Sequence, residues 1–212
     1  MLVVTTLLTS TPDPQRGTKW ECDPALVETL RVSLGDTTLE ILHDEPPINA
    51  SGFGVWTPVE RTHANPYFDR WKAYADHLAG ATGEAWLVDG TDVEMLHEPE
   101  IEPGCLYVGS EPHPVGIPWM RQLHPSMERW LSNHYDQQML NAGIVGGQAP
   151  IVAQFAADMA AMANDTDATD MGVFNKIARS DRWMHRIRTG LPVHTKYKAF
   201  EHDHPTAWWR HK

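Results

Sequence analysis

Two carboxylates, Asp89 and Asp92, stand directly after an apolar run from Ala85 to Val88, with Gly90 and Thr91 between them. Residues three apart on a continuous strand point to opposite faces, so the two acids converge only if the chain leaves the strand between them. Glycine permits that turn because it tolerates backbone angles that other residues avoid. The pattern predicts a buried strand that delivers two acids to the edge where open α/β sheets bind ligands.

Two converging carboxylates and one imidazole form a suitable site for Mn²⁺ or Mg²⁺, which accept oxygen ligands and leave positions open for a phosphate. An ion held there could neutralise a diphosphate and stabilise it as a leaving group. The other interpretation is a tight turn in which each side chain accepts hydrogen bonds from backbone N–H groups. Taken alone, Asp89 and Asp92 favour neither interpretation over the other.

The N-terminal part of the chain has the order strand, helix, strand. Residues 2 to 8 and residues 37 to 43 are β-rich apolar runs. Between them, Asp23-Pro24 is typical of a helix start and Gly35 of a helix end. This order predicts neighbouring parallel strands.

Further elements follow with no repeat or linker between them. Asp170 is expected to cap the last helix, and residues 46 to 63 and 110 to 118 are expected to be loops. We therefore expect a single domain over residues 1–212 with an α/β fold, in which helices cover both faces of a mostly parallel central sheet. Helices are predicted at 66–78, 126–139, 151–162 and 171–179, and strands at 105–109 and 140–147.

The composition limits the class of protein. The formal net charge is −11 at pH 7, which argues against binding of nucleic acid through a broad basic surface. Two cysteines, Cys22 and Cys105, match neither a disulfide framework nor a metal-site spacing, so we expect reduced thiols in a cytoplasmic protein. The apolar N-terminus reaches Pro12 too soon to span a membrane.

The segments Val-Asp-Gly-Thr-Asp-Val (88–93) and Leu-Asn-Ala-Gly-Ile-Val-Gly-Gly (140–147), with the C-terminal Trp-Trp-Arg-His-Lys, carry a resemblance to a known family. Together with the order of elements over residues 1 to 211, they resemble GT-A type nucleotide-sugar glycosyltransferases, particularly bacterial and phage members. The likeness extends more distantly to the glycosyltransferase domain of procollagen lysyl hydroxylases, which also spaces its metal acids as Asp-x-x-Asp. The resemblance implies a GT-A-like, Rossmann-like sheet.

The resemblance also implies roles for individual residues. Asp89 and Asp92 would bind Mn²⁺ or Mg²⁺, with His211 as the third ligand and His194 as the alternative. Asp170 and Asn141 are the expected catalytic residues, Asp170 facing the donor sugar or the acceptor. Thr5 and Thr6 would lie near the nucleobase, Arg70 would reach the nucleotide, and residues 141 to 143 would line the sugar pocket. The expected donor-binding residues are Thr5, Thr6, Arg70, Asp89, Gly90, Asn141, Ala142 and Gly143.

The function implied is metal-dependent transfer of a hexose from a nucleotide-sugar, with a UDP-sugar expected, to an acceptor hydroxyl. The acceptor is expected to be a carbohydrate or a protein, for example a phage or bacterial protein in the bacterial or phage-infected host cytoplasm, and loops 46–63 and 110–125 are expected to bind it. Two alternatives stay open. One is a metal-dependent nucleotide or phosphoester hydrolase that uses the same acids, and the other is a non-catalytic carbohydrate-binding module whose nine tryptophans offer stacking surfaces.

Overall fold

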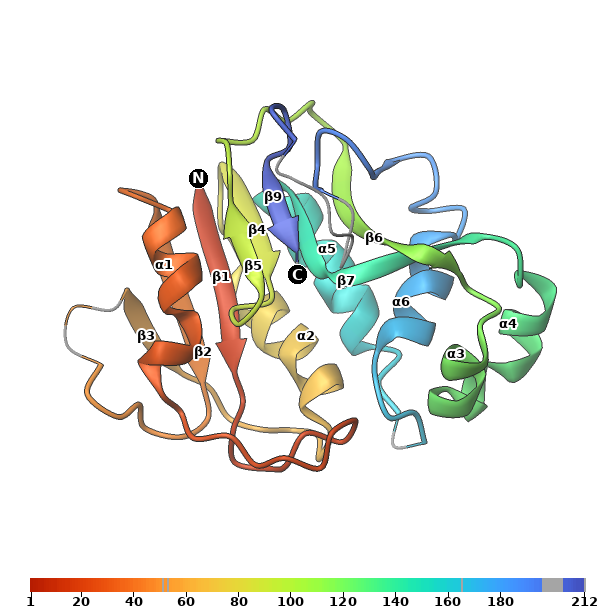
Figure 1. Ribbon diagram of the computed structural model, residues 1–212, viewed down its shortest axis with the longest axis horizontal. Helices are drawn as coiled ribbons and strands as arrows, with labels where there is room; N and C mark the ends of the chain where they lie inside the picture. Colours follow the sequence, from red (N-terminus) through yellow and green to blue (C-terminus); the bar gives the residue numbers. More distant parts are fainter. Residues whose placement is uncertain (51, 53, 165, 196–203, 212) are drawn as a thin grey trace.

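A seven-stranded sheet runs through the centre of the computed structural model, which describes residues 1–50, 52, 54–164, 166–195 and 204–211 (Figure 1). Six strands run in one direction, and only β7 runs against its two neighbours. The expected α/β fold with a mostly parallel sheet is therefore confirmed. The strands in spatial order are β3 (Val55–Pro58), β2 (Thr38–His43), β1 (Leu2–Leu7), β4 (Glu84–Val88), β7 (Gln138–Gln148), β6 (Leu106–Pro114) and β8 (Ile187–Arg188).

Helices cover both faces of this sheet, as expected. On one face pack α2 (Pro66–His77), α5 (Ala149–Ala160) and α6 (Met171–Ala178), with α3 (Pro118–Leu123), a 3-10 turn (Pro125–Met127) and α4 (Glu128–Asn133) beside them. On the other face, a 3-10 turn (Pro24–Val27) leads into α1 (Glu28–Ser33). A separate two-stranded sheet of β5 (Val93–Met95) and β9 (Trp209–His211) completes that layer.

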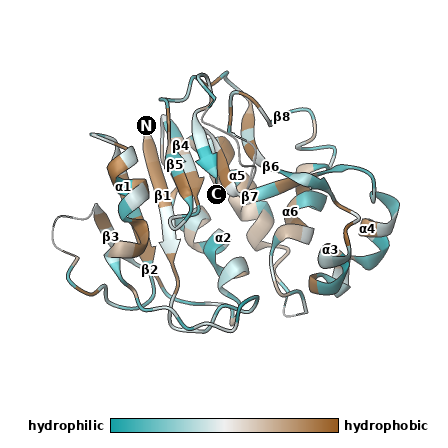
Figure 2. Cartoon of the chain, in the orientation of Figure 1, coloured by the Kyte–Doolittle hydropathy of each residue, from teal (hydrophilic) through white to brown (hydrophobic). Residues whose placement is uncertain are grey.

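Strand β4 shows why the central sheet is apolar on both sides. Successive side chains of a strand point to opposite faces. Ala85 and Leu87 pack in the core with α2, α5 and α6, whereas Trp86 and Val88 pack in the core with α1, β5 and β9. A strand buried on both faces reads as a continuous apolar run. Figure 2 shows that the first part of β1 is hydrophobic and that its arrowhead is near neutral, while the loop beyond it is mostly hydrophilic.

Several predicted boundaries were wrong. The helix expected at 126–139 ends at Asn133, because Gln138 already pairs with Pro114 in the sheet. Strand β6 extends through part of the expected loop 110–118, and β3 lies within the expected loop 46–63, of which Ser51 and Phe53 are outside the described residues. At these places the sequence does not alternate between apolar and polar residues. These parts become strands because they pair with a neighbouring strand.

The described residues contain no helix with the length and apolar character needed to cross a membrane. Cys22 and Cys105 are both free and buried.

The loop after β1 is held by Asp44, which follows β2. Its Oδ1 accepts a hydrogen bond from the backbone N–H of Thr9 at 2.7 Å, and its Oδ2 accepts one from Arg61 Nη1 at 2.9 Å. Ser10 donates to Oδ2 through both its N–H and its hydroxyl. Burial opposes ionisation of this 2% exposed side chain, but the hydrogen bonds from Ser10, Arg61 and Thr9 outweigh it and hold the pKa of Asp44 below its ordinary value.

We expect Asp44→Asn to reduce the acid sensitivity of the fold. Because the folded-state pKa is depressed, the stability from Asp44 is present above its ordinary value of 3.8 and is lost as the pH falls through the lower folded-state value. Urea unfolding at about pH 6 and about pH 3 should show a larger loss of unfolding free energy for the wild type than for the variant. The exposed Asp36→Asn variant should lose as much as the wild type, and an equal loss in Asp44→Asn would contradict the prediction.

Candidate metal centre

The turn between β4 and β5 carries both acids. Strand β4 ends at Val88 and β5 begins at Val93, so Asp89 and Asp92 lie at the two ends of a short turn at the carboxyl end of β4. A Cβ on Gly90 would lie 2.7 Å from Val27 Cγ1 and 2.8 Å from Thr5 Oγ1. Only glycine therefore fits this turn against the layer below it, and the chain leaves the strand between the acids as the sequence predicts.

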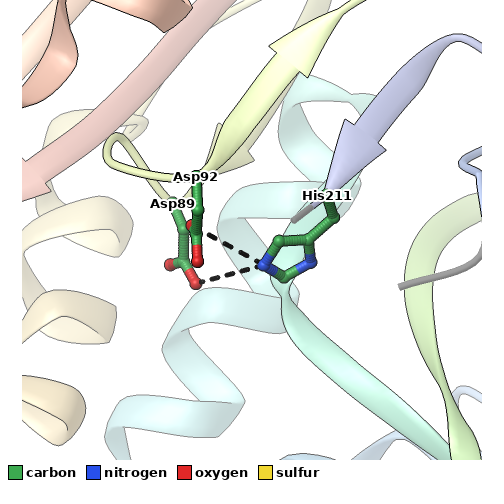
Figure 3. A group of neighbouring side chains, drawn as sticks. All are labelled: Asp89, Asp92 and His211. Atoms are coloured by element: carbon green, nitrogen blue, oxygen red, sulfur yellow. Dashed lines mark ion pairs between the residues drawn. The ribbon is translucent and has the colours of Figure 1, made fainter. Parts of the chain in front are cut away.

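Strand β9 brings His211 to these acids. It pairs antiparallel with β5, and the register places His211 opposite Val93, the residue after Asp92. The imidazole is 4% exposed, and its Nε2 lies 3.6 Å from Asp92 Oδ1 and 4.0 Å from Asp89 Oδ2. Figure 3 shows the three side chains pointing toward one another. One ligand atom from each lies within 4.8 Å of the other two, which is a spacing that a single ion can bridge.

The donor set fits a hard divalent cation. Asp92 Oδ1 is buried and has no hydrogen-bond partner among the described residues. Neither carboxylate accepts a hydrogen bond from a backbone N–H of those residues; Asp89 Oδ1 accepts one from Arg70 Nη1 at 2.7 Å. The interpretation of the acids as caps of a tight turn is therefore wrong. Two carboxylates and one imidazole suit Mn²⁺ or Mg²⁺.

His194, the alternative third ligand, is hydrogen-bonded to other residues than the two acids. Its Nδ1–H donates to Thr195 O, and its Nε2 accepts from the backbone N–H of Ser110 at 3.0 Å. Burial lowers the pKa of His194, and the nearby His211 lowers it further. Both ring nitrogens are engaged, so the structure groups His211, not His194, with the two acids.

Arg70 connects Asp89 to the buried Asp170. Arg70 from α2 donates to Asp170 Oδ2 through Nε at 2.9 Å and Nη2 at 2.7 Å, and Trp71 Nε1 donates to the same oxygen at 2.5 Å. Burial opposes the charge on Arg70, but Asp170 and Asp89 outweigh it and raise its pKa. Asp170 stands at the start of α6 without capping it, contrary to expectation, because its side chain turns to Arg70.

Strand β7 forms the floor beneath the acids. Asn141 donates through Nδ2 to Glu111 Oε1 and accepts through Oδ1 from the N–H of Gly143 at 2.6 Å. A Cβ on Gly143 would lie 2.5 Å from His211 Cε1 and 2.6 Å from Asp89 Oδ2. The imidazole and the carboxylate can approach each other only because residue 143 has no side chain.

We expect Gly143→Ala to weaken Mn²⁺ binding at least about tenfold, because outer contacts that orient metal ligands typically matter by ten- to a hundredfold. The added methyl group would separate His211 from Asp89. Isothermal titration with MnCl₂ measures the affinity, and the urea midpoint shows whether the fold is kept. Wild-type affinity in a folded variant would contradict the prediction.

A cavity of about 330 Å³ opens above this floor. Its lining includes five of the expected donor-binding residues, and also Asp92, His211 and Asp170; the five are Arg70, Asp89, Asn141, Ala142 and Gly143. Thr5, Thr6, Gly90 and His194 do not line it. Thr5 is 0% exposed beneath Gly90, and Thr6 Oγ1 lies 3.4 Å from Tyr74 OH.

Five lining residues, Glu111, Pro112, His113, Ile117 and Trp119, lie in the segment 110–125 that was expected to bind the acceptor. Other lining residues were not anticipated from the sequence: Gln15, Arg16, Tyr67, Met139, Thr169 and Met171. Tyr67 precedes Arg70 by three residues on α2, and that helical spacing was a usable signal.

Comparison with known proteins identifies no relative of this chain. No model of a protein family matches the chain, and the search of curated proteins gives no match. The function is therefore inferred from the site and not from kinship.

Proposed function

We propose that this chain is a metal-dependent glycosyltransferase of the GT-A type, which transfers a hexose from a nucleotide-sugar, a UDP-sugar first of all, to an acceptor hydroxyl. The observation that carries the proposal is the convergence of Asp89, Asp92 and His211 at the floor of a cavity. That floor lies at the carboxyl end of β4, the side on which open α/β sheets bind ligands.

Asp89, Asp92 and His211 would hold Mn²⁺ or Mg²⁺. When bound, the ion supplies positive charge to the donor diphosphate and stabilises it as a leaving group. Arg70 keeps one oxygen of Asp89 hydrogen-bonded, so the second oxygen, Oδ2, faces His211. This hydrogen bond orients Asp89 before any substrate arrives, which is the preorganisation that catalysis by positioning needs.

Other residues that line the cavity also fit a transfer reaction. Arg16 lines the cavity and offers a cation to phosphate oxygens, while Gly143 lets the donor approach the backbone closely. Asp170 and Asn141 remain the proposed catalytic residues, since both line the cavity. The two free, buried cysteines accord with the proposed cytoplasmic setting in a bacterium or a phage-infected cell.

Isothermal titration of UDP with Mn²⁺, with Mg²⁺ and without metal tests the proposal. We expect UDP to bind only with a metal present. A donor at about 100 times its Kd should stabilise the fold by about 2.7 kcal/mol, so a thermal-shift screen of nucleotide-sugars identifies it. Metal-independent UDP binding, or none, would refute the proposal.

A second measurement separates transfer from hydrolysis. UDP release from the donor found in that screen is followed with and without candidate acceptors. A transferase is expected to release UDP faster when an acceptor is present and to form a glycosylated product. Equal rates with release of free sugar would identify a hydrolase, and binding without turnover a carbohydrate-binding module.

A further inference from the structure

The loop after β1 carries Arg16 into the lining of the cavity. Arg16 and Arg70 are the arginines of that lining among the described residues. Arg70 is already hydrogen-bonded to Asp170 and Asp89. Arg16 is held more loosely, because its Nε lies 4.0 Å from Asp13 Oδ2 and its side chain is 59% exposed. Arg16 is therefore the arginine of the lining that an anionic ligand can engage.

Asp13 holds residues 13–18, which we call the Asp13 turn, in a closed conformation. Its Oδ1 accepts hydrogen bonds from the backbone N–H of Gln15 at 2.8 Å and of Arg16 at 3.3 Å. Its backbone C=O accepts from the N–H of Gly17 at 2.7 Å, and its own N–H donates to Thr18 O at 2.9 Å. Gly17 has a φ of 68°, a left-handed conformation that glycine adopts without strain. Local hydrogen bonds and one glycine therefore shape the Asp13 turn.

Tyr67 of α2 fastens the Asp13 turn to the rest of the protein. Its hydroxyl donates to Asp13 Oδ1 at 3.1 Å and lies 3.4 Å from Gln15 Oε1. Within the part of the chain that the structure describes, Tyr67 makes the hydrogen bonds that join residues 13–18 to another helix or strand. Burial raises the pKa of Tyr67, and the nearby Asp13 raises it further, so the hydroxyl keeps the proton that it donates.

The ring of Tyr67 connects this contact to the candidate metal centre. The guanidinium carbon of Arg70 lies 5.8 Å from the centre of the Tyr67 ring, and Arg70 Nη1 donates to Asp89 Oδ1 at 2.7 Å. A continuous series of contacts therefore leads from the Asp13 turn through Tyr67 and Arg70 to Asp89.

We infer that Tyr67 is a positioning residue, whose hydroxyl holds the Asp13 turn so that Arg16 meets the phosphates of a ligand bound at the metal centre. A guanidinium pairs well with phosphate oxygens, because its planar fork matches their geometry. A turn that is already in place loses less conformational freedom when the ligand binds, and this raises the affinity. The inference rests on the proposed function and adds to it the residue that sets the place of Arg16.

Isothermal titration of the whole chain with UDP and Mn²⁺ tests the inference. Tyr67→Phe removes the hydroxyl and keeps the ring beside Arg70. Its matched control is Tyr74→Phe, which removes a hydroxyl from the same helix outside the cavity lining. Arg16→Gln removes the cation, and Arg121→Gln is its control, because Arg121 is exposed and does not line the cavity.

We expect Tyr67→Phe to bind UDP about fivefold more weakly than the wild type, the equivalent of one hydrogen bond of about 1 kcal/mol. Arg16→Gln should weaken UDP binding at least about tenfold, because it removes a charge-assisted contact with phosphate. Tyr74→Phe and Arg121→Gln should bind UDP as the wild type does. Mn²⁺ alone should bind all four variants no more weakly than it binds the wild type.

The double variant Tyr67→Phe/Arg16→Gln separates positioning from a general loss of structure. If Tyr67 acts through Arg16, the double variant should bind UDP as weakly as Arg16→Gln alone. Losses that multiply in the double variant would overturn the inference. Wild-type affinity for UDP in Tyr67→Phe would also overturn it.

Asp13 gives a second test of the same contact, which stays informative if Tyr67→Phe does not fold. Asp13→Asn keeps an oxygen that accepts from the Tyr67 hydroxyl, so it should keep most of the affinity for UDP. Asp13→Ala removes that oxygen and should bind UDP at least about fivefold more weakly. Urea midpoints show which variants are folded, and equal affinities of the two Asp13 variants would contradict the inference.

Failure of the proposed function is recognised separately, by titration with inorganic pyrophosphate and Mg²⁺. If the wild type binds no UDP with Mn²⁺ but binds pyrophosphate, and Tyr67→Phe weakens that binding, the positioning role stands and the transferase proposal fails. If UDP binds the wild type and Tyr67→Phe equally, the proposed function stands and the positioning role is wrong. If neither ligand binds, both are wrong.

Discussion

Replacing either Asp89 or Asp92 with asparagine should lower the affinity for Mn²⁺ at least about 100-fold, since even outer-shell changes cost ten- to a hundredfold. Each acid offers an oxygen to the same small cluster, and Asp92 Oδ1 is already buried without a hydrogen-bond partner among the described residues. Asparagine keeps the shape but removes the charge that attracts a hard cation. Mn²⁺-dependent binding of UDP should be lost in parallel, as measured by isothermal titration.

Controls for this prediction come from the same chain. The exposed Asp36→Asn variant should bind Mn²⁺ as the wild type does. His211→Ala should weaken binding strongly, whereas His194→Ala should leave it nearly unchanged, because both nitrogens of His194 already have protein partners. A folded Asp89→Asn or Asp92→Asn variant with full Mn²⁺-dependent UDP binding would show that the site is wrong.

Replacing Arg70 with methionine should destabilise the fold by about 3–5 kcal/mol, the usual cost of removing one partner of a buried ion pair. Asp170 is 1% exposed, and three of the hydrogen bonds to its Oδ2 come from Arg70 and Trp71. Methionine leaves the buried carboxylate with only the indole N–H of Trp71 among these donors. Urea unfolding near neutral pH measures the change in unfolding free energy.

The matched control is Lys72→Met on the same helix. Lys72 pairs with Asp76 at the surface, where such pairs contribute at most about 1 kcal/mol. Adding Asp170→Asn to Arg70→Met should recover part of the lost stability, because it removes the uncompensated charge. Loss of less than about 1 kcal/mol in Arg70→Met would indicate that the pair is hydrated, and would contradict its assignment as buried.

The layered fold was predictable because its signals are local. The apolar runs of β1, β2 and β4 and the start signals of the 3-10 turn Pro24–Val27 and of α2 each lie within a few neighbouring residues. Asn65 accepts from the N–H of Tyr67 at 2.9 Å, as a helix cap should. The short strands β3, β5 and β9 escaped prediction because pairing partners far along the chain define them.

The sequence by itself determined that Asp89 and Asp92 lie in a turn at the end of a buried strand. The signals for this, an apolar run followed by a glycine between the acids, lie within a few neighbouring residues. It left open which histidine joins them. The pairing of β5 with β9 decided that choice by placing His211 opposite Val93, while Ser110 and Thr195 engage His194. The physical reason is that strand register depends on contacts between distant segments, which local residue patterns do not encode. Tertiary structure alone likewise brought Arg16 and Met171 to the same cavity as Asp89 and Asp92.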